Sequence, residues 1–279
     1  MDPIIFLICF AALWLIFASV YDIKKRIIPN WAVISLAIFA LGFRFFYSLF
    51  SNDFLFFYQG LIGLGIFFIL GNLLYYARIF AGGDSNLMVA LGTVLPFYDT
   101  FSRNLESFAL FIVLFLFVGG IYGIFYSGIL VTKNYISFKK EFRKQFGKNK
   151  KFVYLITAIG VLVMLFGFFD ILIFYLGILI FIAAWLFIYS KSVDETCLIK
   201  NIKTSELEEG DWLYKDVKID KKTFKANWKG LTKIQIGEIR KKLKKVEIRY
   251  GVPFVPVFLI SFLIFVWIYF KGVGFFGIF

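Results

Sequence analysis

Two aspartates in this sequence stand where apolar runs are interrupted. Asp22 ends the first apolar run, and Asp84 follows Gly82 and Gly83 at a later break. An ionisable side chain at membrane depth is costly, and its presence there by default indicates a function. Two carboxyl groups that share a site do not ionise together easily, so one can hold a proton while the other acts as a base. If these acids meet, the pair can activate water for peptide hydrolysis.

Each acid alone also has a structural interpretation. Asp84 could be an N-cap for a helix that begins near Ser85, and Asp22 could be a polar stop at a membrane interface. The two acids together, each in a distinctive setting, favour the catalytic interpretation. Gly82 and Gly83 carry no side chain, so they are interpreted as giving a substrate backbone access to the site.

Composition places the chain among polytopic membrane proteins. Of 279 residues, 61% are hydrophobic and 40 are Phe, and the mean hydropathy is +0.83. The absence of histidine excludes Ser-His-Asp and Cys-His catalysis and metal sites built on His. The two cysteines form no CxxC pair, so no metal site is predicted, and no cofactor is expected.

The apolar runs predict an all-α polytopic membrane protein with about eight transmembrane helices and a small α+β cytoplasmic module. Arg44 lies inside the second run and is expected to snorkel outward. The predicted spans are residues 4–21, 31–50, 54–76, 85–98, 108–131, a hairpin of two helices within 152–189, and 254–270.

This layout divides the chain into five parts. They are a membrane-embedded catalytic domain at 1–131, a basic cytoplasmic loop at 132–151, a transmembrane hairpin at 152–189 that turns near Asp170, a small cytoplasmic module at 190–251, and a C-terminal transmembrane helix at 252–279.

The distribution of basic residues predicts the orientation in the membrane. Of the 31 Lys and Arg residues, only Arg44, Arg103 and Lys271 fall outside the connections on one side of the predicted layout. That side is expected to be cytoplasmic, with both termini outside. Asp22 follows the first span and Asp84 precedes the fourth, so both acids are expected at the cytoplasmic ends of their helices.

The polar region 190–251 carries signals of local structure. Thr232 and Gln235 form a capping box that predicts a helix over 233–246, with Ile234, Ile239 and Leu243 facing inward. A turn is predicted at 208–211, and residues 212–214 and 217–219 are candidate short strands. The basic stretch 133–151 has aromatic residues among its charges. Next to a span, this favours an amphipathic segment at the membrane surface over nucleic-acid binding.

Several motifs resemble those of prepilin peptidases. The stretch from Asp22 through Arg26 to Pro29 and Asn30 looks like the first aspartate motif of that family, and residues 81–84 resemble its GxGD motif. The segments 210–212 and 250–254 are similar to the C-terminal region of archaeal members. The chain is therefore identified as resembling the archaeal preflagellin/prepilin peptidase group.

The resemblance implies an aspartic endopeptidase of the cell membrane, with Asp22 and Asp84 as catalytic acids on the cytoplasmic side. It implies cleavage of class III signal peptides from prepilin or preflagellin (archaellin) precursors. The family's first glycine is Ala81 here, and a frequent lysine is Asn86. These departures predict a different substrate choice or pH profile. The four cysteines of a zinc site found in bacterial relatives are absent.

Three other functions are weighed. A presenilin-like intramembrane protease shares the Tyr-Asp and GxGD elements, but its Pro-Ala-Leu motif is absent. A transporter could use Asp22 and Asp84 as an ion relay, although no inverted repeat is visible. A structural assembly protein is supported mainly by the basic connections. The expected partners are precursor proteins and the lipid bilayer, and no nucleic acid.

Overall fold

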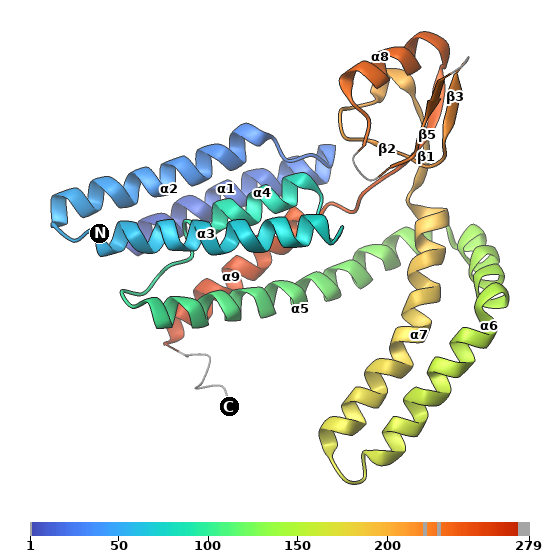
Figure 1. The fold of residues 1–279 in the computed structure, drawn as a ribbon, viewed down its shortest axis with the longest axis horizontal. Coiled ribbons are helices and arrows are strands. Elements are labelled where there is room, and N and C mark those ends of the chain that lie inside the picture. The colour runs from blue at the N-terminus through green and yellow to red at the C-terminus, as the bar shows by residue number, and fades with distance from the viewer. Residues whose placement is uncertain (1, 220–221, 228–229, 273–279) are drawn as a thin grey trace. The chain divides into compact units, whose positions relative to one another are not determined.

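The computed structural model describes residues 2–219, 222–227 and 230–272, in which helices predominate (Figure 1). The helices of this part are α1 (Pro3–Lys25), α2 (Asn30–Ser51), α3 (Leu55–Tyr76), α4 (Gly82–Gly92), α5 (Phe101–Lys133), α6 (Tyr135–Phe166), α7 (Ile171–Cys197), α8 (Lys233–Lys242) and α9 (Val255–Lys271). The strands are β1 (Ile199–Lys203), β2 (Trp212–Leu213), β3 (Val217–Ile219), β4 (Lys222–Phe224) and β5 (Lys245–Arg249).

The described residues form two compact units. The first contains the chain up to Ile124 together with the part from Val252 onward, so α9 folds with α1 to α4 although 125–251 intervene in sequence. The second unit contains residues 125–251. The remainder of the predicted C-terminal part, 273–279, lies outside the described residues.

Six helices of the described chain are long and apolar enough to cross a membrane: α1, α2, α3, α5, α6 and α7. The chain is therefore a multi-pass membrane protein, but the predicted count of eight spans is not confirmed. α4 has 11 residues and α9 has 17. At about 1.5 Å of rise per residue, α4 covers roughly half of a hydrocarbon core that is about 30 Å thick.

Glycines allow α4 to pack closely against α3. A Cβ added at Gly92 would lie 2.5 Å from the carbonyl oxygen of Gly63, and one at Gly71 would lie 2.9 Å from that of Ser85. Between helices in a membrane, small residues permit this backbone approach and the packing that follows from it. Close packing of the two backbones therefore holds α4 against α3, and the α4 residues Leu87 and Leu91 lie in the hydrophobic core.

Arg44 of α2 organises the backbone that follows α4. Residues 93–97 form no regular helix or strand, yet they are buried. The Arg44 side chain is fully buried beside them, at 0% exposure. A Cβ at Gly60 would come within 2.5 Å of Arg44 Cδ, so this glycine makes the room. The guanidinium donates to four carbonyl oxygens: Thr93 at 2.8 Å, Phe56 at 3.0 Å, Val94 at 3.1 Å and Pro96 at 2.7 Å.

The prediction that Arg44 snorkels outward is therefore wrong. Irregular backbone at membrane depth leaves carbonyl groups without intrahelical partners, and such groups must find donors inside the protein. Arg carries five N–H donors in a planar fork. Arg44 donates three of its four hydrogen bonds to carbonyls of the segment 93–97, and these bonds account for the inward position of its side chain.

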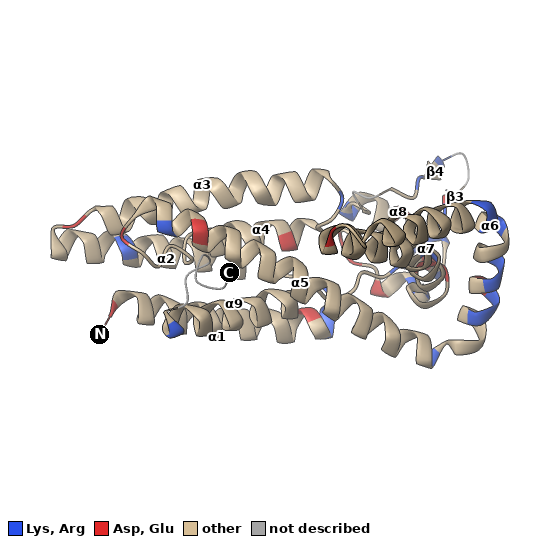
Figure 2. Cartoon of the chain, turned by 90° about the horizontal axis from the view of Figure 1, so that it is seen from below, with Lys and Arg blue, Asp and Glu red and all other residues tan. Residues whose placement is uncertain are grey.

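The second unit contains the last part of α5, followed by the antiparallel hairpin of α6 and α7. The hairpin turns at 167–170 as predicted, and Asp170 Oδ1 accepts the N–H of Leu172 at 2.8 Å. The basic stretch expected as a loop at 132–151 is mostly helical, because α6 begins at Tyr135. A break at Asn149 (φ −110°, ψ 16°) separates the basic first part of α6 from its apolar second part, and Figure 2 shows the blue Lys and Arg ribbon on that first part.

The polar module contains the sheet β1-β5-β2, the hairpin β3-β4 and α8. The capping box is confirmed, since Thr232 N donates to Gln235 Oε1 at 2.9 Å. The predicted helix is too long, because α8 ends at Lys242 and the next residues alternate inward and outward as β5. Ile234 is 77% exposed rather than inward-facing, and Ile236 takes the core position.

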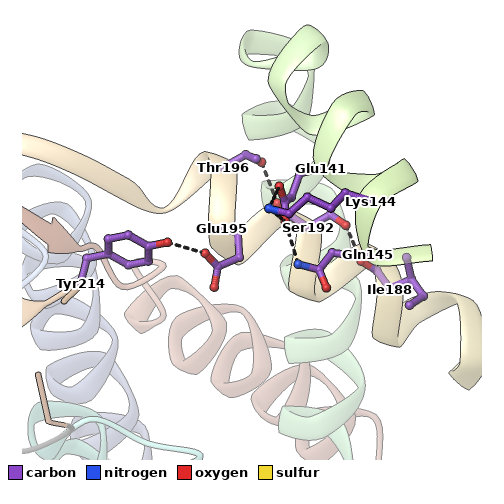
Figure 3. Close-up of polar contacts among 8 residues, drawn as sticks. All are labelled: Glu141, Lys144, Gln145, Ile188, Ser192, Glu195, Thr196 and Tyr214. Atoms are coloured by element: carbon purple, nitrogen blue, oxygen red, sulfur yellow. Dashed lines mark hydrogen bonds and ion pairs between the residues drawn. The ribbon is translucent and has the colours of Figure 1, made fainter. Parts of the chain in front are cut away.

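Side-chain contacts attach this module to α7 (Figure 3). Tyr214 Oη donates to Glu195 Oε2 at 2.7 Å, and this hydrogen bond raises the pKa of Tyr214 to about 12. Arg249 at the end of β5 pairs with Asp194 at 3.3 Å and with Glu195 at 3.6 Å. The sheet and the end of α7 are therefore joined by three polar contacts.

Candidate active site

Asp22 lies in the last turn of α1 and is buried, at 5% exposure. The helix ends at Arg26, which adopts a left-handed conformation (φ 58°) and donates its N–H to the Asp22 carbonyl. The Asp22 carboxylate accepts the backbone N–H of Val255 at 2.9 Å. Asp22 is thus a side chain buried inside the protein, where it contacts the start of α9.

The other residues of the first motif build the reversal between α1 and α2. Arg26 makes the left-handed turn, and its charge acts on Asp22. Pro29 is the extended N-cap of α2 (φ −62°, ψ 126°), and Asn30 is the first, exposed residue of that helix. The residue before Pro29, Ile28, is buried at 7% exposure. The residues of the first motif therefore form a tight connection between α1 and α2, in which the side chain of Ile28 is buried.

Asp84 is the third residue of α4. Its Oδ2 accepts the N–H of Ala81, the N-cap residue, at 3.3 Å. The helix begins at Gly82, so the alternative that Asp84 is an N-cap of a helix starting near Ser85 is wrong. A carboxylate in the first turn is stabilised by the helix dipole and by free N–H groups. Ala81, which replaces the family's first glycine, supplies its backbone N–H at this position.

The structure brings the two motifs together. A Cβ added at Gly83 would lie 3.2 Å from Ile28 Cβ, so the start of α4 packs on the α1–α2 connection. The charge of Asp22 acts on Asp84, which places both carboxyl groups within electrostatic range. Gly82 faces more open space, with Tyr75 Cε2 at 3.9 Å from an added Cβ.

An aromatic cluster holds the start of α4 against the start of α9. Phe80 directly precedes the motif of Asp84, and its ring lies 5.6 Å from Phe115, 6.3 Å from Phe254 and 6.0 Å from Phe258, measured between centroids. Phe115 and Phe258 are 4.6 Å apart. The backbone segments that carry Asp84 and contact Asp22 are therefore fixed by one packed group of rings.

Sequence reasoning did not assign α9 to the site. The segment 250–254 was noted for its resemblance to archaeal relatives, and that was the available signal. Neither its charge nor its spacing from Asp22 predicted a contact, because 233 positions separate Asp22 from Val255. Phe80 and its partners were also missed, since an apolar ring beside an apolar run carries no distinguishing pattern.

The arrangement can perform acid–base chemistry on a peptide bond. Two carboxyl groups from different helices share one region, one of them buried and one partly exposed. Such a pair titrates as a unit and can hold a single proton between its members. One oxygen can then accept a proton from water while the other donates to a carbonyl.

Comparison with known proteins places both acids in a matched region. Residues 9–128 match the model of the type IV leader peptidase family. Residues of the chain are 34% identical over 88 positions to the preflagellin peptidase of Methanocaldococcus jannaschii, and 35% identical over 85 positions to that of Methanococcus maripaludis. The preflagellin peptidase of Methanococcus voltae is 31% identical over 86 positions.

These matches are partial. They cover 32%, 30% and 31% of this chain, and 37%, 36% and 36% of the three relatives in the same order. The chain thus spans little more than a third of the length of the curated relatives it matches. The predicted resemblance to archaeal preflagellin peptidases is confirmed. The family match ends at residue 128, before α9.

Proposed function

We propose that this protein is a membrane aspartic endopeptidase that removes class III signal peptides from prepilin or preflagellin precursors. Asp22 and Asp84 are its catalytic acids. The observation that carries the proposal is the packing of Gly83, which precedes Asp84 in α4, against Ile28 in the connection that follows Asp22. The names of the similar proteins from methanogens support the substrate class.

The reaction follows from the acid pair. One carboxylate takes a proton from water, whose oxygen attacks the scissile carbonyl carbon, while the other carboxyl group gives its proton to the carbonyl oxygen. The tetrahedral intermediate then collapses. The C–N bond breaks, the amine leaves with the proton that the first acid had accepted, and one hydroxyl proton of the intermediate returns to the second carboxylate as the new carbonyl forms. Neither acid is assigned the starting proton, because the pair titrates together.

The substrate is expected to lie across the membrane boundary. Its basic leader is in the cytoplasm and its apolar helix is in the bilayer, so the scissile bond falls near the helix ends that carry Asp22 and Asp84. The basic connections of the chain support a cytoplasmic location of these ends. The exposed backbone at Gly82 leaves room for an extended substrate beside Asp84.

An eight-crossing topology belongs to the same proposal. α4 is short, but the buried residues 93–97 continue from it with their carbonyls bound to Arg44. α4 and this segment together are taken as one crossing, and α9 as another. With these crossings the chain is on the cytoplasmic side after α5. The basic first part of α6 then lies on that side.

The proposal is tested with Asp22→Asn and Asp84→Asn in membranes that contain pilin and archaellin precursors. Each substitution removes one ionisable group while keeping a side chain of similar size, so cleavage should fall by at least about a thousandfold. The N-termini of the products are sequenced. Asp53→Asn is the matched control, because Asp53 is exposed and its Oδ1, an atom that Asn also has, accepts the N–H of Leu55.

The outcomes separate the rival functions. Trimming of a short basic leader supports the proposal, whereas cuts in the middle of the apolar helix favour presenilin-like proteolysis. Ion flux in proteoliposomes without precursor cleavage favours a transporter that uses the two acids as an ion relay. A folded Asp22→Asn protein that still cleaves the precursor would rule out the assigned acid pair.

A further inference from the structure

The N-terminus of α9 contacts one of the two proposed catalytic acids. Val255 is the first residue of α9, and its N–H donates to Asp22 Oδ2 at 2.9 Å. The N–H of Phe254 also interacts with this carboxylate. The first N–H groups of a helix have no partners inside that helix, and they favour a negative group placed on the axis.

The start of α9 is held rigidly. The Val255 side chain is fully buried, and Phe258, one turn later, packs 4.6 Å from Phe115 between ring centroids. Farther along the helix, Phe265 lies 5.3 Å from Phe97. A donor on such a fixed element can orient a carboxylate without moving when the charge on that carboxylate changes.

We propose that the first turn of α9 is a positioning element of the active site, in which the Val255 N–H orients the Asp22 carboxylate toward Asp84. This inference rests on the proposed peptidase function. It adds a component from outside the family match, which ends at residue 128. The active site then contains residues of α1, α4 and α9, and residues 125–251 precede α9 in the sequence.

A purely structural role is the competing explanation, in which Asp22 serves only to cap α9. The two explanations differ in what the hydrogen bond controls. A cap affects folding stability alone. A positioning donor affects the turnover of bound substrate and the pH range of activity. The other charged groups that act on Asp22 are Arg26 and Asp84, and both are unchanged by a modification of the α9 backbone.

The test replaces the amide of Val255 by an ester in the full-length protein, using the α-hydroxy analogue of valine. This removes the N–H donor and keeps the side chain. The matched control is the same replacement at Val257, whose N–H donates to the Phe254 carbonyl at 3.0 Å in the same turn. Each variant loses one hydrogen bond donated by a backbone N–H in the first turn of α9, to Asp22 in the first variant and to Phe254 in the second.

The Val255 ester should lower kcat for precursor cleavage about tenfold or more, with KM little changed, since hydrogen bonds to charged groups are the strong ones. The acidic limb of its pH–rate profile should move to higher pH, because a donated N–H favours the ionised carboxylate. The Val257 ester should keep the wild-type profile. Equal kcat and equal pH profiles for the two esters would overturn the inference.

A second measurement does not depend on activity. Backbone hydrogen exchange at Phe254 and Val255 should speed up severalfold in Asp22→Ala and stay unchanged in Asp84→Ala, since only Asp22 accepts the Val255 N–H. Unchanged exchange in both variants would overturn the inference even for an active enzyme. A wild-type protein that cleaves no precursor but shows the expected exchange would instead count against the proposed function and leave the contact with Asp22 in place.

Discussion

Gly82 and Gly83 are neighbours in sequence with different surroundings. Both lie in the first turn of α4, where any residue can adopt the backbone conformation. Conformational freedom therefore does not explain them, and close approach does. Gly83 faces Ile28 of the α1–α2 connection, with 3.2 Å to an added Cβ, whereas Gly82 meets only Tyr75 at 3.9 Å. One glycine serves the packing of the two motifs, and the other leaves space beside Asp84.

Alanine substitutions should separate these two roles. Gly83→Ala forces Ile28 away from α4 and should reduce kcat by displacing Asp84 from Asp22. Gly82→Ala should leave the thermal midpoint unchanged or slightly raised, since Ala is favoured over Gly in a helix by about 0.5–1 kcal/mol. It should raise KM severalfold if the substrate backbone passes over this position. Kinetics on a purified precursor and thermal unfolding in detergent measure both effects, and a normal KM for Gly82→Ala would remove the proposed substrate path.

Among the elements, α4 shows how a short helix is accommodated in a membrane protein. Its 11 residues pack on α3 through glycines, and the buried backbone after it would be unsatisfied without Arg44. The apolar run at 85–98 predicted one continuous span, because hydropathy reports burial and not backbone conformation. Pro96 indicates an irregular segment, but nothing in the sequence connects that segment to an arginine 52 positions away.

Arg44→Lys should destabilise the first unit while conserving charge. Lysine has three donors on one nitrogen and cannot reach four separated carbonyl oxygens, so at least one or two stay buried without a partner, at about 1–3 kcal/mol each. The thermal midpoint and the cleavage activity should fall together. Arg103→Lys is the control, since Arg103 is exposed. An Arg44→Lys protein as stable as wild type would show that the carbonyl contacts contribute little.

On the scale of the whole molecule, each unit is completed by a long-range connection. In the first unit α9 contacts Asp22, although residues 125–251 lie between them in the sequence. In the second unit Tyr214 and Arg249 attach the sheet to the end of α7 through Glu195 and Asp194. Local composition distinguishes a polar region from an apolar hairpin, but it does not indicate which side chains of the two regions form pairs.

The contact of Tyr214 with Glu195 predicts an alkaline transition. The folded-state pKa of Tyr214 is raised to about 12 by the hydrogen bond to Glu195, above its ordinary value of about 10. The contribution of this contact to stability is therefore fully present below about pH 10 and is lost as the pH rises toward 12. Absorbance titration should show one tyrosine fewer titrating near pH 12 in Tyr214→Phe. Glu195→Gln should bring that transition closer to pH 10, and an unchanged titration would contradict the contact.

The sequence by itself determined the class of protein and the family that its two aspartate motifs resemble. Those properties follow from hydropathy, charge and short-range spacing, which can be evaluated from the sequence alone. Only the tertiary structure decided that Arg44 turns inward, that Gly83 rests on Ile28, and that α9 contacts Asp22. The reason is physical: such contacts depend on which helix faces pack together, and apolar helices with nearly uniform faces carry little information about their neighbours.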